Sequence, residues 1–558
     1  MSSNITEKFK KYKLKPSNEK MEEICRPASF KLQPQQLFLK DYFTSRSSGK
    51  GILIYHKIGA GKTCTAITIA EEYIKKMDVI VVLPAALIGN FKDELRGDCG
   101  KYMTQEERNE IKDLSPRDKI YKNILEKTDQ RIEKYYTIYS YHKFIELCQD
   151  NKIKLRNTLL IIDEIQNMIS ENGPFYKNLK RIIDKSDDKT RIILLSATPM
   201  FDKPEEIALT LNLLKTNDYF NISKFNHDYI DIHNINKGIE YSIKNNDDFT
   251  NKIKNLVSYY RGAPPKAYPK LEFKVIKCKM SDFHYKSYLT SLSSDEQNIK
   301  GSFKNVDILN LPQNFFLGPR MISNIAFPNK SIGDIGFSSF NGDVLLLYNI
   351  KKYSIKFYKI LKKIKLSEGP VFIYSNFKDY GGIKCLLSFL NYHGYKNYKD
   401  FGEGDKTYAV WSSDEPHHLK EQLKYAFNQP DNYNGSKIKI ILGTPSIKEG
   451  VSLLRVEQVH ILEPYWNMSR LLQIMGRAVR FCSHKDVPKN KRFVQVYLYL
   501  ATYSNIKTID QYIWELAKQK NKLIEQFEVI LKESAIDCEL FYNRNSYKTD
   551  THVLKCKH

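Results

Sequence analysis

Residues 443–480 read GTPSIKEGVSLLRVEQVHILEPYWNMSRLLQIMGRAVR and end in a Gln-x-x-Gly-Arg-x-x-Arg pattern. In this pattern Gln473 and Gly476 precede Arg477 and Arg480. The two arginines stand about one helical turn apart, a spacing that suits two guanidinium groups binding the γ-phosphate of a nucleotide from across a cleft. Arginines act in this way only if another part of the chain holds the nucleotide. The pattern therefore predicts two lobes with ATP bound between them.

A candidate phosphate loop lies near the amino terminus, in the sequence HKIGAGKT at residues 56–63. Gly59, Ala60 and Gly61 allow backbone amides to wrap around a phosphate. Lys62 and Thr63 open a helix whose positive end faces that anion. We expect Lys62 to reach the β- and γ-phosphates and the Thr63 hydroxyl to bind Mg²⁺.

Two carboxylates follow a predicted buried strand. Four apolar residues, 159–162, lead into Asp163 and Glu164, which places both side chains at the carboxyl end of that strand. We expect Asp163 to hold Mg²⁺ through water, and Glu164 to orient and deprotonate the attacking water. An acidic helix cap is the alternative interpretation. It does not explain why the pair follows a phosphate loop by about a hundred residues.

Two further segments carry candidate site residues, and neither is specific on its own. Residues 192–195 form a strand that runs into Ser196-Ala197-Thr198-Pro199. The hydroxyl groups there are expected to hydrogen-bond the carboxylates of Asp163 and Glu164. In FKLQPQQLFLKDYF, residues 30–43, Gln36 is a candidate for reading the adenine base through its amide.

Short apolar runs alternate with helical patterns, which predicts an α/β fold with parallel sheets. In the first lobe we expect strands over residues 52–55, 79–83, 137–139, 159–162 and 192–195. In the second lobe we expect strands over 369–377, 438–442, 459–462 and 493–500, and a helix over 468–481. A helical pattern over 508–532 is expected to pack against the second lobe, and residues from 543 onward are expected to fray.

The chain of 558 residues is too long for one hydrophobic core. We predict an amino-terminal extension, a first lobe, an inserted and partly helical bridge domain, a second lobe, and a carboxyl-terminal helix with a tail. Their respective bounds are 1–29, 30–214, 215–354, 355–503 and 504–558. The bridge is assigned because the pattern loosens there into polar and aromatic residues with Gly-Pro punctuation. Its aromatic residues either stack on bases or, more commonly, belong to a core.

Lys and Arg outnumber Asp and Glu by 88 to 64, giving a formal charge of +24. This charge favours a polyanionic partner, although a general bias toward Lys, Asn and Ile also explains it. None of the nine cysteines lies in a Cys-x-x-Cys pair, so we expect reduced thiols, without a zinc site or a disulfide framework. The amino terminus lacks the apolar core of a signal peptide, and the longest apolar run, 79–88, is about half a membrane span. We expect a cytosolic or nuclear protein that is not inserted in a membrane.

Taken in order along the chain, HKIGAGKT, DEIQ, SATP and QIMGRAVR resemble motifs I, II, III and VI of the superfamily 2 helicases and translocases. VVLPAALIGNFKDEL (81–95) and ATPMFDKPEEIALTLNLL (197–214) look like the Swi/Snf-type branch. A narrower resemblance links VSYYRG (257–262), SNIAFP (323–328), GPVFIYSNF (369–377) and EPYWNMSRLLQIMGRAVRFCSH (463–484) to nucleoside triphosphatase I and the small subunit of the early transcription factor. Those are ATPases of poxviruses and other large cytoplasmic DNA viruses. The resemblance covers residues 30–540.

The resemblance implies two RecA-like lobes that bind ATP and Mg²⁺, with Gly450 and Gln473 also contacting the nucleotide. It implies a DNA-dependent ATPase, acting as a helicase or translocase with a viral RNA polymerase. Its role would lie in early initiation, or in elongation and transcript release. The implied location is the virion and the host cytoplasm.

The chain departs from the family pattern in several places. Ile474 replaces an Arg that is often second in motif VI. His56 departs from a different and more general pattern, because it stands where Gly-x4-Gly-Lys-Ser/Thr has its first Gly. Gln166, a candidate catalytic residue, replaces the His common at the fourth position of motif II, a difference that bears on how hydrolysis is coupled to DNA. The short carboxyl end implies that a docking module for a capping enzyme is absent.

Two other functions stay open at this point. An RNA helicase fits the same motifs, because they do not show which nucleic acid is bound. A non-catalytic, promoter-binding subunit is the second alternative. The presence of Lys62, Asp163, Glu164, Arg477 and Arg480 argues against it, since an ATPase that has lost its activity usually lacks one of them.

Overall fold

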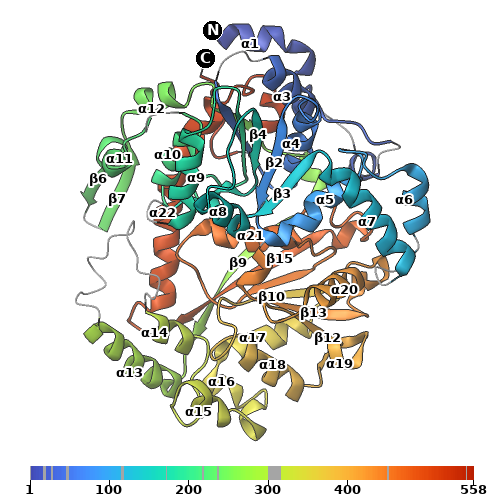
Figure 1. Ribbon diagram of the computed structural model, residues 1–558. Coiled ribbons are helices and arrows are strands. Elements are labelled where there is room, and N and C mark those ends of the chain that lie inside the picture. The colour runs from blue at the N-terminus through green and yellow to red at the C-terminus, as the bar shows by residue number, and fades with distance from the viewer. Residues whose placement is uncertain are drawn as a thin grey trace. The chain divides into compact units, whose positions relative to one another are not determined.

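The computed structural model describes residues 2–557 except 17–19, 27–28, 46–48, 113, 115–117, 171–172, 216–218, 236–237, 299–315, 449–450 and 548–549 (Figure 1). The chain divides into two compact units, residues 1–264 with 522–558, and residues 265–521. The predicted boundaries differ from this division. Residues 215–354, predicted as an inserted bridge, are shared between the two units.

The first unit contains a six-stranded parallel sheet in the order β3-β2-β4-β5-β1-β8. Its strands are β1 (Gly51–His56), β2 (Asp78–Leu83), β3 (Tyr136–Ser140), β4 (Thr158–Ile162), β5 (Arg191–Ser196) and β8 (Val257–Tyr260). Every residue of β1 and β4 is buried, as expected of a parallel sheet covered on both faces. The five strands predicted here are confirmed. The sequence pattern does not indicate β8, because four residues are too few to show a period.

Helices cover both faces of this first sheet. The apolar residues of α3 (Pro34–Ser45), α4 (Lys62–Ala70), α5 (Ile88–Arg96) and α7 (Lys119–Glu133) form one core with the strands. The other face is covered by α8 (Tyr141–Gln149), α9 (Pro174–Asp184) and α10 (Glu205–Asn212) (Figure 1). The remaining α-helices and strands described up to residue 253 are α1 (Ser2–Lys8), α2 (Met21–Cys25), α6 (Gln105–Ile111), α11 (Ile222–Tyr229), the hairpin of β6 (Ile230–Ile235) and β7 (Gly238–Ile243), and α12 (Asn246–Ile253).

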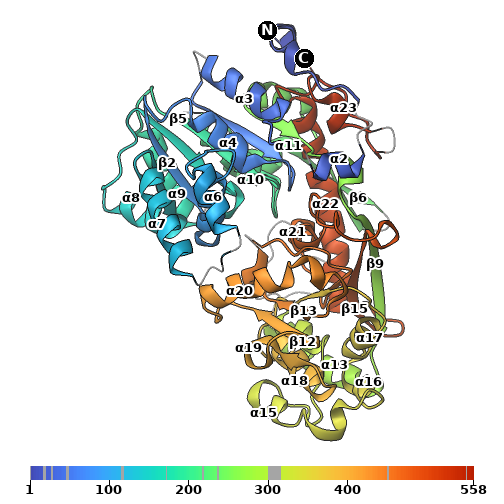
Figure 2. The same ribbon diagram turned by 90° about the vertical axis from the view of Figure 1, so that its right-hand side faces the viewer.

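The second unit contains a seven-stranded parallel sheet in the order β11-β12-β13-β10-β14-β15-β9. Its strands are β9 (Lys270–Lys279), β10 (Val371–Tyr374), β11 (Lys396–Asn397), β12 (Gly404–Trp411), β13 (Ile438–Gly443), β14 (Gln458–Ile461) and β15 (Phe493–Thr502). The four predicted strands are confirmed as β10, β13, β14 and β15. Strand β9 pairs along the whole of β15 at the edge of the sheet (Figure 2). Its sequence, KLEFKVIKCK, did not indicate a strand because its lysines make it read as a solvated segment.

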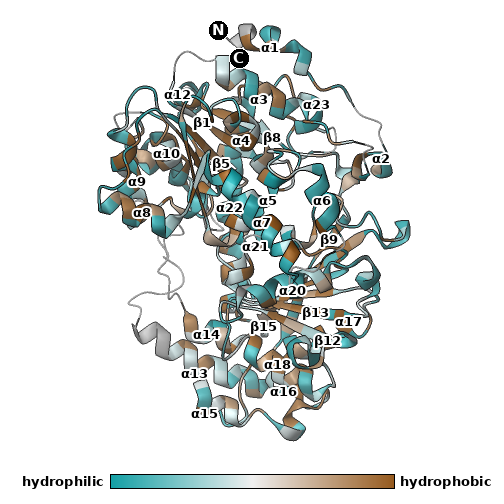
Figure 3. Ribbon diagram, turned by 45° about the vertical axis from the view of Figure 1, so that its right-hand side comes forward, coloured by the Kyte–Doolittle hydropathy of each residue, from teal (hydrophilic) through white to brown (hydrophobic). Residues whose placement is uncertain are grey.

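Helices also cover both faces of the second sheet. The core on one face includes α17 (Ile355–Ile364) and α18 (Ile383–Tyr392), and the core on the other includes α20 (His417–Phe427) and α21 (Met468–Ala478). The brown, apolar residues of Figure 3 gather on the strands. The second unit also contains the α-helices α13 (Asp282–Asn298), α14 (Leu317–Ile322), α15 (Gly333–Ser338), α16 (Ile350–Tyr353) and α19 (Tyr398–Phe401). Within the described ranges no helix is long and apolar enough to cross a membrane.

Helix α22 (Ile509–Glu533) confirms the helix predicted over 508–532, but its two halves pack differently. Ile509 and Ile513 join an apolar core of the second unit. Phe527 belongs to the first unit, where its ring centroid lies 5.8 Å from that of Phe225 and 5.3 Å from that of Phe249. The prediction that this helix packs on the second lobe is wrong for this half. Helical periodicity shows which face is apolar and not what covers that face.

The prediction of reduced thiols is wrong for at least four cysteines. Disulfides join Cys64 to Cys99 and Cys538 to Cys556, with Cα atoms 5.4 and 5.7 Å apart. The spacing of two cysteines in the sequence does not show how close their Cα atoms lie in the folded chain. The tail predicted to fray is held by the second disulfide, contains α23 (Tyr542–Asn545), and buries Leu554. The free cysteines are Cys148, Cys278 and Cys385.

Candidate active site

The predicted phosphate loop connects β1 to α4 in the first unit. Gly59 and Gly61 both have a positive φ, +79° and +75°, a conformation that strains residues with a Cβ atom. Gly61 is the amino-terminal cap of α4, so the helix begins at Lys62. The positive end of α4 and its unpaired amides therefore face the loop. Lys62 and Thr63 are half-buried there, as a phosphate site requires.

Gln36 lies against this loop, where the sequence predicts a base-reading amide. It belongs to α3 and is 4% exposed. The backbone amide of Gln33 donates to its Oε1 at 2.8 Å, which fixes the orientation of the side chain. A Cβ atom on Gly61 would lie 3.0 Å from the Gln36 Nε2. The amide and the phosphate loop are therefore direct neighbours.

The two predicted carboxylates follow β4 directly. Asp163 is 6% exposed, and its Oδ1 accepts a 2.9 Å hydrogen bond from the backbone amide of Glu164. Glu164 adopts a φ of +51°, an unusual conformation for this residue type. The Tyr141 hydroxyl donates to the carbonyls of both residues, at 2.5 and 2.9 Å, and so holds this turn. Sequence reasoning missed Tyr141, because nothing in its local pattern indicates a contact with motif II.

The strand order places the phosphate loop and the two carboxylates at the same end of the sheet. β5 lies between β1 and β4. Because parallel strands point in the same direction, the phosphate loop and the carboxylates both lie at the carboxyl-terminal end of these strands. A hydroxyl group and a carboxylate are oxygen ligands of the kind that Mg²⁺ takes together with water and phosphate oxygens. Thr63 and Asp163 therefore fit the Mg²⁺ site that the sequence predicts.

A chain of hydrogen bonds runs from Glu164 to motif III. The Gln166 Nε2 donates to the Glu164 Oε2 at 2.6 Å, and the Ser196 hydroxyl donates to the Gln166 Oε1 at 2.6 Å. The backbone amide of Thr198 then donates to the Ser196 Oγ at 3.0 Å. The prediction that the hydroxyl groups bond the carboxylates directly is wrong for Ser196. Gln166 stands between them because its amide carries both a donor and an acceptor.

Gln166→Ala should lower ATP turnover stimulated by nucleic acid roughly tenfold and leave the affinity for ATP unchanged. The change removes the donor to Glu164 and leaves the buried Ser196 hydroxyl without its acceptor, at a cost of about 1–3 kcal/mol. Steady-state turnover with and without nucleic acid measures the effect. Asn178→Ala, on the surface of the same unit, is the control. Unchanged stimulation in Gln166→Ala would show that this chain of hydrogen bonds has no part in turnover.

The arginines of motif VI converge on one backbone carbonyl in the second unit. The Arg477 Nη1 and the Arg480 Nη2 donate to the carbonyl of Val451, at 3.3 and 3.2 Å. Helix α21 ends at Ala478, so Arg480 lies beyond it, and the helix predicted to extend to residue 481 is too long. The backbone carbonyl of Gln473 accepts from the Arg477 Nε at 3.0 Å. Gly450, predicted to contact the nucleotide, lies outside the described residues.

Sequence reasoning missed a buried polar network beside β10 and β14. The Glu463 carboxylate accepts from the Ser375 hydroxyl at 3.0 Å and from the Asn324 Nδ2 at 2.9 Å, and burial raises the pKa of Glu463. The fully buried Lys356 donates to the Asn324 Oδ1 at 2.8 Å and to the Asp510 Oδ2 at 2.7 Å. The segments SNIAFP and GPVFIYSNF supply two of these residues. Only the fold reveals their pairing, since the partners are far apart in sequence.

Three domain families match the chain in succession. The SNF2-related domain matches residues 35–323, and the helicase conserved C-terminal domain matches residues 355–482. The nucleoside triphosphatase I C-terminal domain matches residues 484–551. The first match alone covers more than half of the chain.

Similar proteins occur in large DNA viruses. The chain is 48% identical over 548 residues to a putative ATP-dependent RNA helicase of Acanthamoeba polyphaga mimivirus, covering 97% of this chain and 95% of the relative. It is 27% identical over 571 residues to the termination factor NPH-I homolog of African swine fever virus, covering 88% and 76%. Among solved structures, the Sulfolobus solfataricus SWI2/SNF2 ATPase core in complex with dsDNA aligns over 98% of this chain and 99% of that chain, with 13% identity and a TM-score of 0.32. The chain therefore belongs to the SNF2-related family of helicase-type ATPases, and it carries the carboxyl-terminal domain of nucleoside triphosphatase I.

Proposed function

We propose that this protein is a DNA-dependent ATPase that moves along DNA during viral transcription, with a viral RNA polymerase as its partner. The observation that carries the proposal is that the phosphate loop, Asp163 and Glu164 all lie at the carboxyl-terminal end of the first sheet. The match to the nucleoside triphosphatase I domain and the likeness to a viral termination factor support a role in elongation and transcript release. The sites of action that follow are the virion and the host cytoplasm.

The chemistry of hydrolysis is assigned to side chains of both units. Lys62 neutralises charge on the β- and γ-phosphates, and Glu164 orients the attacking water and takes its proton. Bound Mg²⁺ supplies further charge neutralisation at these phosphates. Arg477 and Arg480 stabilise the charge that develops on the γ-phosphate. Because the arginines belong to the second unit, hydrolysis depends on nucleic acid to bring them to the nucleotide.

A basic surface of the second unit supports nucleic acid as the partner. It consists of α17 and the neighbouring part of β9, where the Lys359 ammonium donates to the Lys277 carbonyl at 2.5 Å. The Lys363 ammonium lies 4.0 Å from the Tyr497 ring centroid. Burial lowers the pKa of Lys363, and the charges of Lys274 and Lys359 lower it further. Within the described part of the chain no carboxylate lies within 4 Å of Lys359 or Lys363, so this surface suits a polyanion.

The logarithm of the association constant for DNA should fall linearly with the logarithm of the salt concentration. The expected slope is about −0.9 per phosphate contact on duplex DNA and about −0.7 on single strands. Replacing Lys359 and Lys363 together by Ala should reduce the duplex slope by roughly 1.8 if each contacts one phosphate. Fluorescence anisotropy at a series of KCl concentrations measures both slopes. The matched control replaces Lys143 and Lys152, which pair with Glu146 and Asp150 on the first unit. If the affinity of the unaltered protein for DNA did not change with salt concentration, the charge of +24 would reflect amino-acid composition and not DNA binding.

An RNA helicase is the second candidate, because the relative that is 48% identical is named a putative ATP-dependent RNA helicase. Displacement of a third strand from a DNA triplex and unwinding of an RNA duplex separate the two activities. We expect ATP-dependent triplex displacement without RNA unwinding. RNA unwinding without triplex displacement would support the helicase. Failure of ATP hydrolysis with every nucleic acid would support a non-catalytic subunit.

A further inference from the structure

The carboxyl-terminal part of the chain covers the outer edge of β8. The backbone amide of Ile536 donates to the carbonyl of Val257 at 2.9 Å. The backbone amide of Tyr259 donates to the Asp537 Oδ1, and its carbonyl accepts from the Asn545 Nδ2, both at 2.9 Å. Residues 528–546, here named the clasp segment, thus occupy the edge that β8 would otherwise leave unpaired.

A buried chain of side chains connects the clasp segment to the phosphate loop. The Ser258 hydroxyl donates to the Asp537 Oδ2 at 2.5 Å, and the His56 Nε2 lies 3.1 Å from the Ser258 Oγ. All three side chains are fully buried. His56 ends β1 and stands where the general phosphate-loop pattern Gly-x4-Gly-Lys-Ser/Thr has its first Gly. The departure in the sequence therefore coincides with a contact that a glycine would not make.

A second contact reaches the loop from the same segment. The Lys57 ammonium, at the next position of the loop, lies 3.5 Å from the Glu528 carboxylate. Lys532 pairs with the same carboxylate at 2.7 Å. Burial acts to raise the pKa of Glu528, but the charges of Lys57 and Lys532 outweigh it and lower the pKa to about 2. Burial lowers the pKa of Lys57 to about 8, so both charges of the ion pair are present at neutral pH.

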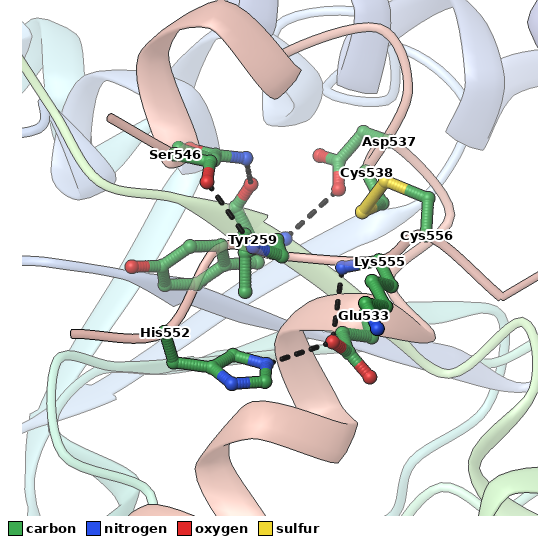
Figure 4. The surroundings of a disulfide bond; sticks show 10 residues. Tyr259, Glu533, Asp537, Cys538, Ser546, His552, Lys555 and Cys556 are labelled. Carbon is green, nitrogen blue, oxygen red and sulfur yellow. Dashed lines mark hydrogen bonds and ion pairs between the residues drawn. A yellow bond between two sulfur atoms is a disulfide. The ribbon is translucent and has the colours of Figure 1, made fainter. Parts of the chain in front are cut away.

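The clasp segment is itself anchored. Figure 4 shows the disulfide between Cys538 and Cys556 next to Asp537, and Glu533 held by His552 and Lys555. The Glu533 Oε1 accepts from the His552 Nε2 at 3.0 Å and from the backbone amide of Lys555 at 2.9 Å. These bonds tie residues 552–557 to the end of α22 and keep Asp537 beside Ser258.

We propose that the clasp segment is a positioning element for the phosphate loop, in which Asp537 orients His56 through Ser258 and Glu528 holds Lys57. This inference rests on the proposed function, because it assumes that the loop binds ATP. It makes Asp537, Ser258 and Glu528 positioning residues that act on nucleotide through His56 and Lys57. The carboxyl-terminal domain would then serve to position the phosphate loop of the first unit.

The proton on Asp537 sets the direction of the hydrogen bonds in this chain. Burial raises the pKa of Asp537 to about 7, although hydrogen bonds from Ser258 and from the Tyr259 amide act to lower it. His56 stays neutral, because burial and then the charge of Lys62 lower its pKa to about 3. An ionised Asp537 accepts from Ser258, whose oxygen then accepts from the His56 Nε2–H. A protonated Asp537 donates to Ser258, whose hydroxyl then donates to an unprotonated Nε2.

The test compares Asp537→Asn with the unaltered protein. We expect kcat/KM for ATP to fall roughly tenfold, the effect of disturbing one buried hydrogen bond to a charged group. The pH profile of kcat/KM should show a step near pH 7 in the unaltered protein and none in Asp537→Asn. Combining His56→Gln with Asp537→Asn should cost no more than the larger single effect, because both changes act on one chain of contacts. Additive effects, or an unchanged kcat/KM and pH step in Asp537→Asn, would overturn the proposal.

Stability offers an independent readout of the same carboxyl group. The ordinary pKa of Asp is 3.8, so between that pH and about 7 the folded chain holds a proton that the unfolded chain releases. The contribution of Asp537 to the free energy of unfolding is therefore greatest at low pH and is lost as pH rises toward 7. Asp537→Asn should remove this dependence, which urea unfolding at a series of pH values measures.

Asp150→Asn is the matched control, because it makes the same change on the surface of the same unit, where Asp150 pairs with Lys152. It should keep the kcat/KM and pH profile of the unaltered protein, and an equal loss in this variant would overturn the specific role of Asp537. If Asp537→Asn does not fold, Ser258→Ala and Ser258→Thr replace it, and only the variant that keeps the hydroxyl should keep wild-type kcat/KM. Loss in both or in neither would contradict the proposal.

Binding of a fluorescent ATP analogue separates this proposal from the proposed function. An unaltered protein that binds the analogue but hydrolyses no ATP would overturn the ATPase, while the clasp would still predict weaker binding in Asp537→Asn. An unaltered protein that binds no nucleotide would overturn both.

Discussion

Glu164→Gln should bind ATP as tightly as the unaltered protein and hydrolyse it about 10³ times more slowly. Glutamine keeps the size of the side chain and an oxygen that accepts from Gln166, so the local structure is preserved. It cannot take a proton from water, and a positioned general base contributes roughly 10²–10⁴-fold to a rate. Single-turnover hydrolysis and equilibrium binding of ATP, measured on the same preparation, give the two values.

Glu133→Gln is the control for this change. Glu133 lies on the surface of the same unit, where its carboxylate is 3.4 Å from the Lys92 ammonium, and its loss should leave turnover unchanged. If Glu164→Gln fails to bind ATP, Glu164 has a structural role in the turn that Tyr141 holds. If it hydrolyses ATP at the wild-type rate, another group activates the water.

Arg480→Ala should remove most of the ATP turnover that nucleic acid stimulates, by a factor of roughly 10³ or more. The affinity for ATP should change little, because the phosphate loop and Gln36 belong to the first unit. Arg477 keeps its own bond to the Val451 carbonyl, so the fold around α21 should persist. Steady-state turnover at saturating DNA, together with the affinity for ATP, measures the effect.

Two further variants define what Arg480 contributes. Arg480→Lys keeps the charge but loses the planar fork of donors, so its turnover should fall between those of Arg480→Ala and the unaltered protein. Lys424→Ala removes a positive charge elsewhere on the same unit and should have no effect. Full stimulation in Arg480→Ala would rule out the action of the motif VI arginines on the nucleotide.

The parts of the site that the sequence predicted are those formed by neighbouring residues. HKIGAGKT contains the glycines, the lysine and the helix start of a phosphate loop in one run, and DEIQ follows its own strand. Such patterns can be recognised in the sequence because the strand, the loop and the start of the helix are formed by residues that are close together along the chain. The other nine predicted strand and helix segments likewise came from local apolar patterns, and all of them match elements of the two units, allowing for their ends.

What the sequence did not predict depends on residues that meet only in the fold. Asp537 and Ser258 are 279 residues apart, and no local pattern marks either of them as a partner of His56. The disulfides escaped prediction for the same reason. Gln166 was visible as a departure from the family pattern, but its bridge between Glu164 and Ser196 requires β4 and β5 to lie side by side.

Whether hydrolysis depends on DNA is decided by ATP turnover of the unaltered protein, measured side by side with duplex DNA, single-stranded DNA, RNA and no nucleic acid. We expect DNA to raise turnover at least tenfold above the basal rate and above the rate with RNA, because nucleic acid brings the arginines of the second unit to the nucleotide. Equal turnover with and without DNA, or greater stimulation by RNA, would contradict this expectation.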